Sequence, residues 1–423
     1  MPFPARAAPF QAEGCLLPGK ASIFATRRRS PPVSDVSSIL TVFVYTPKGN
    51  WQIVCSRWFG NRLNLVAEDN IKAYKYAFSC SGDIALSSFK AGYAGRVGVR
   101  DPWLIHLGDG TPVMDGDCVY LIWANESPYP NDDEAYFKKN KPAFNHSYKA
   151  IHRFNCKTYE ASEVSKIFFR RRSKGTMSIL TDNTGGIVWD RDGDGKFYVV
   201  TSPWGDHPEK GCNTNIEIAV TSDNLLRGIH VLEAKPLPRY GPAYDPGILK
   251  LDGTWYLFTN TALNKKNMWK GLRPPTMYKG ADLNRLELVG NDKGSKVNSE
   301  GHHFQKINGV WYGLAMQANG RTFAYDLKMN KIGMVPPLPP APSLQQPCII
   351  AFPDSGKTKY LWVNNDGTVY PHFLPSYGTP RRHKYENRGT VLTLLANQQL
   401  DHYDFDAWKR NSAHKTDKST RDK

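Results

Sequence analysis

The chain has 423 residues, of which 40% are hydrophobic and 12% aromatic, and its formal net charge at pH 7 is +16. This apolar content suffices for a packed core, yet no apolar run approaches the ~18 residues that a membrane-spanning helix needs, so no membrane partner is expected. The seven cysteines include no Cys-x-x-Cys pair, which argues against a zinc site and against a disulfide framework.

The positive charge is concentrated in short runs. They lie at Arg27–Arg29, Arg170–Arg172 and Arg381–Arg382 and along the tail from Lys409 to Lys423. Runs of this kind are usually solvated, and no RNP, zinc-finger or helix-turn-helix signature accompanies them. We therefore expect no nucleic-acid partner, whereas an anionic glycan remains open as a ligand.

The first part of the chain divides into two segments. Residues 1–36 are rich in Ala, Pro and Arg and have no hydrophobic periodicity, so we expect a disordered N-terminal segment. No sustained apolar stretch follows its basic residues, so it does not read as a secretory signal and the localisation stays unknown. Between 37 and 95 the sequence predicts a hairpin, with strands Val42–Tyr45 and Trp51–Ser56 around the turn Pro47–Asn50.

From about residue 96 to 375 the chain repeats one pattern five times: a turn glycine, then a tyrosine three or four residues later within an apolar strand. An apolar strand also precedes each turn, as at Gly247–Leu251 and Cys348–Phe352. Short antiparallel strands with a period of about 56 residues are typical of β-propeller blades. The repeated tyrosines are Tyr120, Tyr198, Tyr256, Tyr312 and Tyr360.

The expected fold is therefore all-β. We expect a five-bladed β-propeller over residues 37–408 that includes the N-terminal hairpin and ends in a short helix at Leu400–Trp408. A disordered basic tail is expected to follow over residues 409–423.

Three of the five repeats carry an acidic residue at the same place, at the entry to the first strand of the repeat: Asp101, Asp245 and Glu300. In a β-propeller the innermost strands enter the central channel from one face, so equivalent positions in different blades converge. Like charges that converge disfavour joint ionisation. One carboxyl group can then stay protonated while another is ionised, which is the division of labour that glycoside hydrolysis needs. A single such residue would more often form a turn.

The motifs Arg100-Asp101-Pro102, Tyr244-Asp245-Pro246 and Ser299-Glu300-Gly301 resemble those of the five-bladed propeller glycoside hydrolases of family 43, in the clan with family 32, and family 117 is a close alternative. The resemblance spans residues 96 to 375. It implies that Asp101 is the general base, that Glu300 is the general acid and that Asp245 orients the acid. The sequence departs from the family at His302, where the family usually has proline.

The resemblance also implies a reaction and a substrate class. The reaction is a single displacement with inversion, which requires a base and an acid about 6.5–9.5 Å apart. The implied substrates are plant or algal polysaccharide fragments with arabinofuranosyl, xylosyl or galactosyl-type residues, and such a function favours a periplasmic or secreted protein. Two alternatives are a non-catalytic carbohydrate-binding propeller and a glycoside phosphorylase of similar fold.

Five further residues are candidates for binding the substrate. Exposed indole rings stack on the C–H face of a sugar, and His302 alternates with His303 along one strand, so that one of the two is expected to face the channel. His302 would then contact a sugar hydroxyl or be a hydrogen-bonded core histidine, while Arg100 would form an ion pair or contact an anionic substrate. The candidates are Arg100, Trp103, Trp204, Trp269 and His302.

The segment from Asp190 to Gly195 resembles the start of a calcium loop, with acids at Asp190, Asp192 and Asp194. A calcium loop would have glutamate at its twelfth position, which here is Thr201. A hairpin turn rich in Asp and Gly is therefore favoured, with a structural Ca²⁺ as the alternative. No cofactor is expected to be required, no catalytic metal site is predicted, and the oligomeric state is open.

Overall fold

The computed structural model describes residues 21–29, 36–45, 51–60, 67–73, 89–93, 98–126, 146–158, 161–173, 176–180, 185–202, 216–237, 243–263, 271–294, 298–307, 309–317, 322–335, 345–354, 356–365 and 391–395. These residues are almost entirely β-strand, with one α-helix, α1 (Glu68–Ala73), and one short 3-10 helix (Leu283–Arg285). Within this part of the chain no helix is long and apolar enough to span a membrane.

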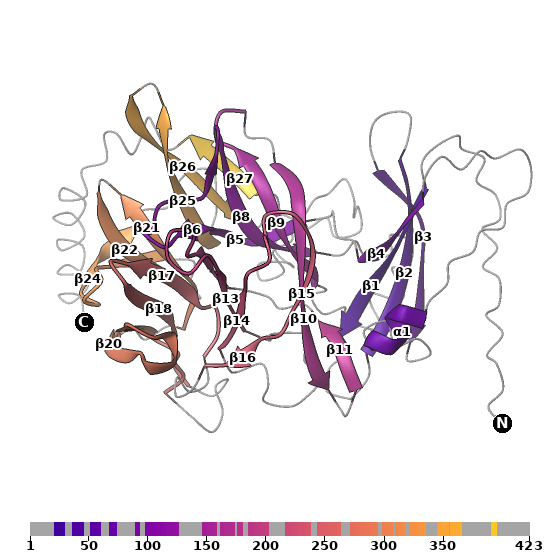
Figure 1. The fold of residues 1–423 in the computed structure, drawn as a ribbon, viewed down its shortest axis with the longest axis horizontal. Helices are drawn as coiled ribbons and strands as arrows, with labels where there is room; N and C mark the ends of the chain where they lie inside the picture. Colours follow the sequence, from indigo (N-terminus) through magenta and orange to yellow (C-terminus); the bar gives the residue numbers. More distant parts are fainter. Residues whose placement is uncertain are drawn as a thin grey trace, which may run out of the picture.

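The N-terminal residues form a sheet of their own, in the order β3-β2-β1-β4. The antiparallel pair β2 and β3 places Tyr45 opposite Trp51, which confirms the predicted hairpin. Because β1 pairs with both β2 and β4, the expectation of disorder throughout residues 1–36 is wrong for Ala21–Arg29. This sheet stands to one side of the others (Figure 1). Its strands are β1 (Ala21–Arg29), β2 (Val36–Tyr45), β3 (Trp51–Gly60) and β4 (Phe89–Tyr93).

Five further sheets are described from Gly98 onward, and each is built mainly of consecutive antiparallel strands. The first contains β5 (Gly98–Leu104), β7 (Met114–Asp115), β8 (Cys118–Glu126), β9 (His146–Asn155), β10 (Ala161–Ser173), β11 (Thr176–Leu180) and β15 (Gly228–Leu232). The second contains β6 (His106–Leu107), β12 (Ile187–Trp189), β13 (Phe197–Thr201), β14 (Glu217–Thr221) and β16 (Lys235–Pro236).

The last three sheets follow the chain without interruption. The third contains β17 (Gly247–Leu251), β18 (Thr254–Asn260), β19 (Pro275–Gly280) and β20 (Glu287–Asn291). The fourth contains β21 (Ser299–Ile307), β22 (Val310–Gln317), β23 (Thr322–Tyr325) and β24 (Lys331–Val335). The fifth contains β25 (Gln345–Asp354), β26 (Lys357–Asn365) and β27 (Val391–Leu395).

The repeated glycine lies in the turn before the second long strand of each of these sheets. Each of these glycines has a positive φ angle, a left-handed backbone conformation that residues with a Cβ atom rarely adopt. The repeated tyrosines lie in the strands that follow, β8, β13, β18, β22 and β26, as the pattern predicts. The φ angles are 59° at Gly116, 77° at Gly195, 74° at Gly253, 79° at Gly309 and 77° at Gly356.

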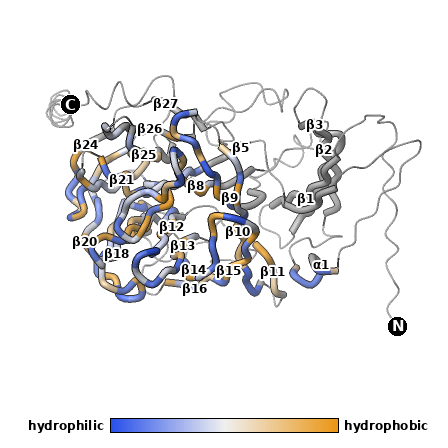
Figure 2. Tube along the Cα trace, turned by 45° about the horizontal axis from the view of Figure 1, so that its top comes forward, coloured by the Kyte–Doolittle hydropathy of each residue, from blue (hydrophilic) through white to orange (hydrophobic). Residues whose placement is uncertain are grey.

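The first strands of the five sheets lie next to one another in sequence order. Strand β6 pairs with β12, β12 contacts β17, β17 contacts β21, β21 contacts β25, and β25 contacts β5. The first strands of successive sheets thus lie side by side, and Figure 2 shows apolar stretches, in orange, in the sheets that contain them. The all-β prediction is confirmed for the described residues. The five-bladed count and the closure of a propeller stay predictions, because residues 366–390 and 396–423, with the expected helix and tail, lie outside them.

Apolar residues fill the spaces between successive sheets. In β12, Ile187 packs in the cluster shared with the first sheet, whereas its neighbour Val188 packs in the cluster shared with the third. Successive side chains of a strand point to opposite faces, so this sheet is buried on both. The fifth sheet packs on the first in the same way, because Cys348 and Ile350 share a cluster with Leu104.

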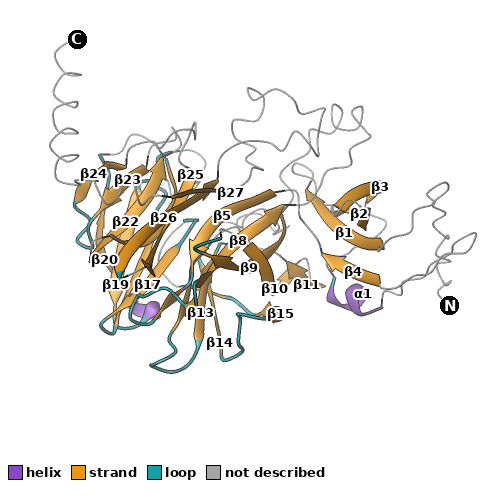
Figure 3. Cartoon of the chain, turned by 90° about the horizontal axis from the view of Figure 1, so that it is seen from above, coloured by secondary structure: helices purple, strands orange, loops and turns teal. Residues whose placement is uncertain are grey.

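One buried ion pair joins the first and second sheets. Arg171 of β10 donates from Nε to Oε2 of Glu217 in β14 at 2.8 Å, and Nη2 lies 2.5 Å from the same oxygen. Both side chains are about nine-tenths buried, with 6% and 10% of their surface exposed. A second pair, Arg170 of β10 with Glu68 of α1 at 2.8 Å, ties the helix to the same sheet, where α1 lies beside β11 (Figure 3).

Removing one member of the Arg171–Glu217 pair should destabilise the protein. We expect Glu217→Leu to lower the free energy of unfolding by about 3–5 kcal/mol, because the buried guanidinium would lose the carboxylate that it pairs with. The double variant Arg171→Met/Glu217→Leu should recover most of this loss. Urea unfolding checks it, with Asp115→Asn in the exposed Arg153–Asp115 pair as a control that should hardly move the midpoint. Equal losses in the single and double variants would contradict it.

Candidate active site

The three candidate carboxylates lie where the first strands are interrupted. The register of β5 with β8 shifts between Arg100 and Trp103, and that of β21 with β22 shifts between Glu300 and His303. The residue Asp245 lies just before β17 begins. An irregularity of this kind releases residues from the ladder and redirects their side chains, which is why bulges are frequent beside active sites.

The backbone at these positions is strained. Asp101 and Asp245 have φ angles of 56° and 54°, in the left-handed region that glycine favours, and each precedes a proline. In the third motif the left-handed residue is Gly301, with φ 57°, one position after Glu300. The three motifs therefore share a backbone turn, but the acid stands one residue earlier in the third. Strain of this kind is concentrated at functional sites.

The third and fourth sheets bring Asp245 and Glu300 together. The Gly301 amide donates to Asp245 Oδ2 at 3.0 Å, and the Tyr244 hydroxyl donates to Glu300 Oε1 at 3.1 Å. Asp245 and Tyr244 are buried, whereas Glu300 is half-buried. The close approach of β17 to β21 requires glycine at 247, where a Cβ atom would lie 2.1 Å from the His302 carbonyl oxygen.

Tyr244 connects Glu300 to a buried cation. Arg273 donates from Nε to the Tyr244 hydroxyl at 3.1 Å. Burial and the nearby Glu300 and Asp245 charges raise the pKa of Tyr244 well above its ordinary value, against the opposing effect of Arg273. The phenol therefore stays protonated and acts as a donor. Sequence reasoning missed both as functional residues: Tyr244 belongs to the second motif, but no local pattern marks Arg273.

Asp101 lies in β5 and is 2% exposed. Two residues later, the Trp103 ring stacks on His303 with a centroid distance of 3.9 Å and an interplanar angle of 22°. This stack brings the Trp103 side chain of β5 into contact with β21, the strand that carries Glu300. Trp103 is only 4% exposed, so it is a packing residue, which corrects the expectation that its ring contacts the substrate.

His302 is a hydrogen-bonded core histidine. Its Nδ1 lies 2.9 Å from the Asp245 carbonyl oxygen, which can only accept, so Nδ1 carries the proton. Burial lowers the pKa of His302 to about 3, so the ring is neutral, and its Nε2 lies within hydrogen-bonding distance of the Ser299 hydroxyl oxygen, at 3.0 Å. With both nitrogens used and none of its surface exposed, His302 cannot reach a substrate, which corrects that expectation.

Near the candidate residues in the chain lies a buried group of rings that we call the axial cluster: Trp103, His106, His303 and Trp311. The His106 and Trp311 rings pack edge to face, with their centroids 5.8 Å apart. Burial lowers the pKa of His106 to about 4, against the opposing effect of Asp109, and lowers that of His303 well below its ordinary value. The axial cluster is therefore aromatic and uncharged.

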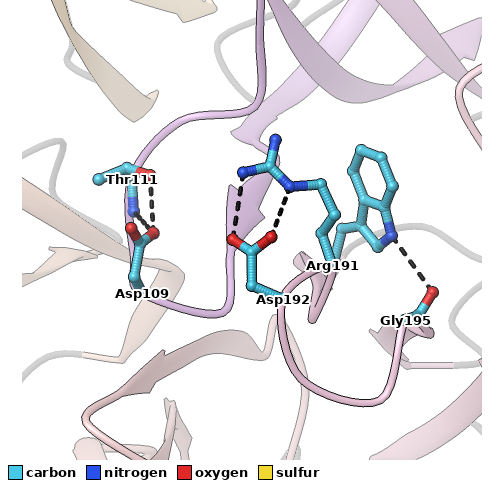
Figure 4. Close-up of polar contacts among 6 residues, drawn as sticks. Asp109, Thr111, Arg191, Asp192 and Gly195 are labelled. Atoms are coloured by element: carbon cyan, nitrogen blue, oxygen red, sulfur yellow. Dashed lines mark hydrogen bonds and ion pairs between the residues drawn. The ribbon is translucent and has the colours of Figure 1, made fainter.

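The calcium-like segment forms a turn in which protein groups bind each carboxylate. Asp190 pairs with Lys250 at 2.5 Å, Asp192 with Arg191 at 3.0 Å, and Asp194 accepts from the Tyr198 hydroxyl at 2.7 Å. Figure 4 shows the Arg191–Asp192 pair beside Asp109, which accepts from Thr111. Within the described residues, no group of three His, Cys, Asp or Glu side chains could hold a metal ion.

Three of the sequence candidates lie outside this description. Trp204, Trp269 and the side chain of Arg100 are not among the described residues, so their roles stay predictions. Among the described residues, hydrogen bonds connect four groups: Asp245 accepts from the amide that follows Glu300, Glu300 accepts from Tyr244, and Tyr244 accepts from Arg273. Asp101 lies in β5, two residues before the Trp103 whose ring stacks on His303.

Comparison with known proteins gives likenesses of structure alone. No protein-family model and no curated protein sequence matches the chain. A family 43 β-xylosidase/α-arabinofuranosidase from a compost microbial metagenome has a TM-score of 0.43 and 12% identity, over 71% of this chain and 92% of that one. An inulosucrase from Halalkalicoccus jeotgali has a TM-score of 0.42 and 14% identity, over 70% and 84%.

A third similar structure is a family 43 glycoside hydrolase from Xanthomonas citri, with a TM-score of 0.40 and 10% identity, over 65% of this chain and 83% of that one. Two of the three structures thus belong to the family that the motifs resemble. Likeness at these scores assigns no role to any residue, so the chemistry of the site depends on its own geometry.

The neutral histidines predict a loss of stability on mild acidification. The pKa of His106 is about 4 in the folded chain and about 6.5 when unfolded. Its contribution is therefore fully present above pH 6.5 and is lost as the pH falls toward 4, at up to about 1.4 kcal/mol per pH unit. Urea midpoints measured from pH 7 to 5.5 should fall less steeply for His106→Gln than for the wild type. Parallel pH profiles would contradict this account.

Proposed function

We propose that this chain is a glycoside hydrolase with a five-bladed propeller fold. The observation that supports the proposal is that three acids belong to the first strands of three sheets: Asp101 lies within β5, Asp245 just before β17 and Glu300 near the start of β21, and Asp245 accepts from the Gly301 amide. Acids at such corresponding places in separate sheets are not needed for turns or caps. They are what hydrolysis of a glycosidic bond requires: a proton donor and a base on opposite faces of the sugar.

Each of the three acids has a distinct role in the proposal. Asp101 removes a proton from the attacking water as its oxygen bonds to the anomeric carbon. Glu300 gives a proton to the glycosidic oxygen as the bond from that oxygen to the anomeric carbon breaks, and the product has inverted configuration. Asp245 holds the Gly301 amide and so fixes the backbone at Glu300. The step needs no cofactor.

The proposed substrates are plant or algal oligo- or polysaccharides with arabinofuranosyl, xylosyl or galactosyl-type residues, anionic glycans included. The resemblance of the three motifs to family 43 supports this class. A polysaccharide substrate also supports a periplasmic or secreted protein.

Replacing the proton donor or the base should abolish turnover while the fold persists. We expect Glu300→Gln and Asp101→Asn each to lower kcat at least about 100-fold, the usual contribution of acid–base catalysis. The assay is sugar release from a panel of aryl glycosides and neutral and sulfated oligosaccharides, with circular dichroism to verify folding.

Two matched controls are available in the third sheet. Asp252→Asn replaces another acid with a left-handed backbone, φ 48°, in an exposed turn, and Glu287→Gln replaces an exposed glutamate. Both should keep wild-type turnover. Wild-type turnover in Glu300→Gln would overturn the proposal. Binding on a glycan array without sugar release would indicate a carbohydrate-binding protein, and release that depends on phosphate would indicate a phosphorylase.

A further inference from the structure

The hydrogen bonds around Glu300 run in one direction. A guanidinium group can only donate, so the Tyr244 hydroxyl oxygen must accept from Arg273 Nε at 3.1 Å. The single hydroxyl proton is then available for Glu300 Oε1, which lies 3.1 Å away. Since Oε1 accepts this bond, the proton of a protonated Glu300 has to stand on Oε2.

Arg273 is held against the strand that carries Glu300. Its amide donates to Asn298 Oδ1 at 3.0 Å, and its carbonyl oxygen accepts from the Ser299 amide at 3.0 Å. Its guanidinium also lies over the Tyr244 ring, 5.3 Å from the centroid, and only 7% of the residue is exposed. The cation therefore has a defined place next to Tyr244 and close to the start of β21.

Tyr244 is fixed by its backbone as well as by its hydroxyl. Its amide donates to Asn260 Oδ1 at 3.1 Å, and Asn260 Nδ2 donates to the Ser299 carbonyl at 2.9 Å. Its carbonyl oxygen accepts from Thr259 Oγ1 at 2.8 Å. Asn260 thus connects the residue before Asp245 to the residue before Glu300, so the two motifs are positioned together.

We propose that Tyr244 and Arg273 are positioning residues for the proton donor, an inference that rests on the proposed function. They direct Oε2 of Glu300 toward the leaving-group oxygen. When the Oε2 proton passes to that oxygen and the electron pair of the broken bond stays on it, Glu300 becomes a carboxylate. The Tyr244 hydrogen bond to it becomes charge-assisted and therefore stronger, so it stabilises the transition state more than the ground state.

The test is the dependence of Tyr244→Phe on the leaving group. For a glycoside with an alkyl or sugar leaving group, whose departure needs a proton, kcat should fall about 10- to 100-fold with little change in KM. For the 2,4-dinitrophenyl glycoside of the same sugar, which leaves without a proton, kcat should stay within about two-fold of the wild type. Tyr325→Phe is the matched control, because it removes a buried tyrosine hydroxyl that donates to Asp292 at 2.8 Å elsewhere.

A second variant removes the guanidinium that donates to the Tyr244 hydroxyl. Arg273→Gln should show the same dependence on the leaving group, and the double variant should lose no more than Tyr244→Phe alone, because both changes act through one hydrogen bond. The single variant Arg273→Gln also tests the inference if Tyr244→Phe does not fold. Equal loss on both leaving groups, in a wild type that is active, would overturn the inference alone. A wild type that releases no sugar would overturn the proposed function and, with it, the positioning role.

Discussion

The structure depends on one packing constraint: the sheets in the middle of the chain must bury both faces. Their strands carry apolar residues at consecutive positions. In the second sheet, Ile187 and Val199 join the cluster shared with the first sheet, and Val188 and Val200 join the cluster shared with the third. In the third sheet, Ile248 joins the cluster shared with the second sheet, and Leu249 joins the cluster shared with the fourth. Two apolar faces can both be buried only when each sheet has a neighbour on each side. A radial arrangement around the first strands provides this.

The radial arrangement also decides where charge can lie. The axis is filled by rings, and burial keeps His106, His302 and His303 neutral there. Charged groups between sheets are paired, as Arg171 is with Glu217. The candidate carboxylates lie instead where the ladder shifts in register or beside a left-handed backbone. An irregularity that would weaken a sheet can thus present a polar side chain.

The hydrogen bonds around Glu300 follow one donor-to-acceptor order. Arg273 donates to the Tyr244 hydroxyl, Tyr244 donates to Glu300, and the Gly301 amide donates to Asp245. Three elements, the loop before β17, the segment before β19 and the start of β21, supply these groups. Because they are tied together by Asn260 and Ser299, the geometry belongs to the interface of two sheets and not to any single motif.

The amino-acid sequence by itself determined the strands, the turn glycines and the three acids, because strand alternation and turn chemistry are local properties that repeat with the chain. The N-terminal strand β1 was missed because its pairing with β2 and β4, and not its composition, makes it a strand. Arg273 could not be found, since its role arises only from contacts with Tyr244 and Ser299. Whether Trp103 and His302 face a ligand or the core was likewise decided by tertiary structure. The residue type limits the chemistry that a side chain can perform, whereas its burial and its hydrogen-bond partners, which other sheets supply, decide its role.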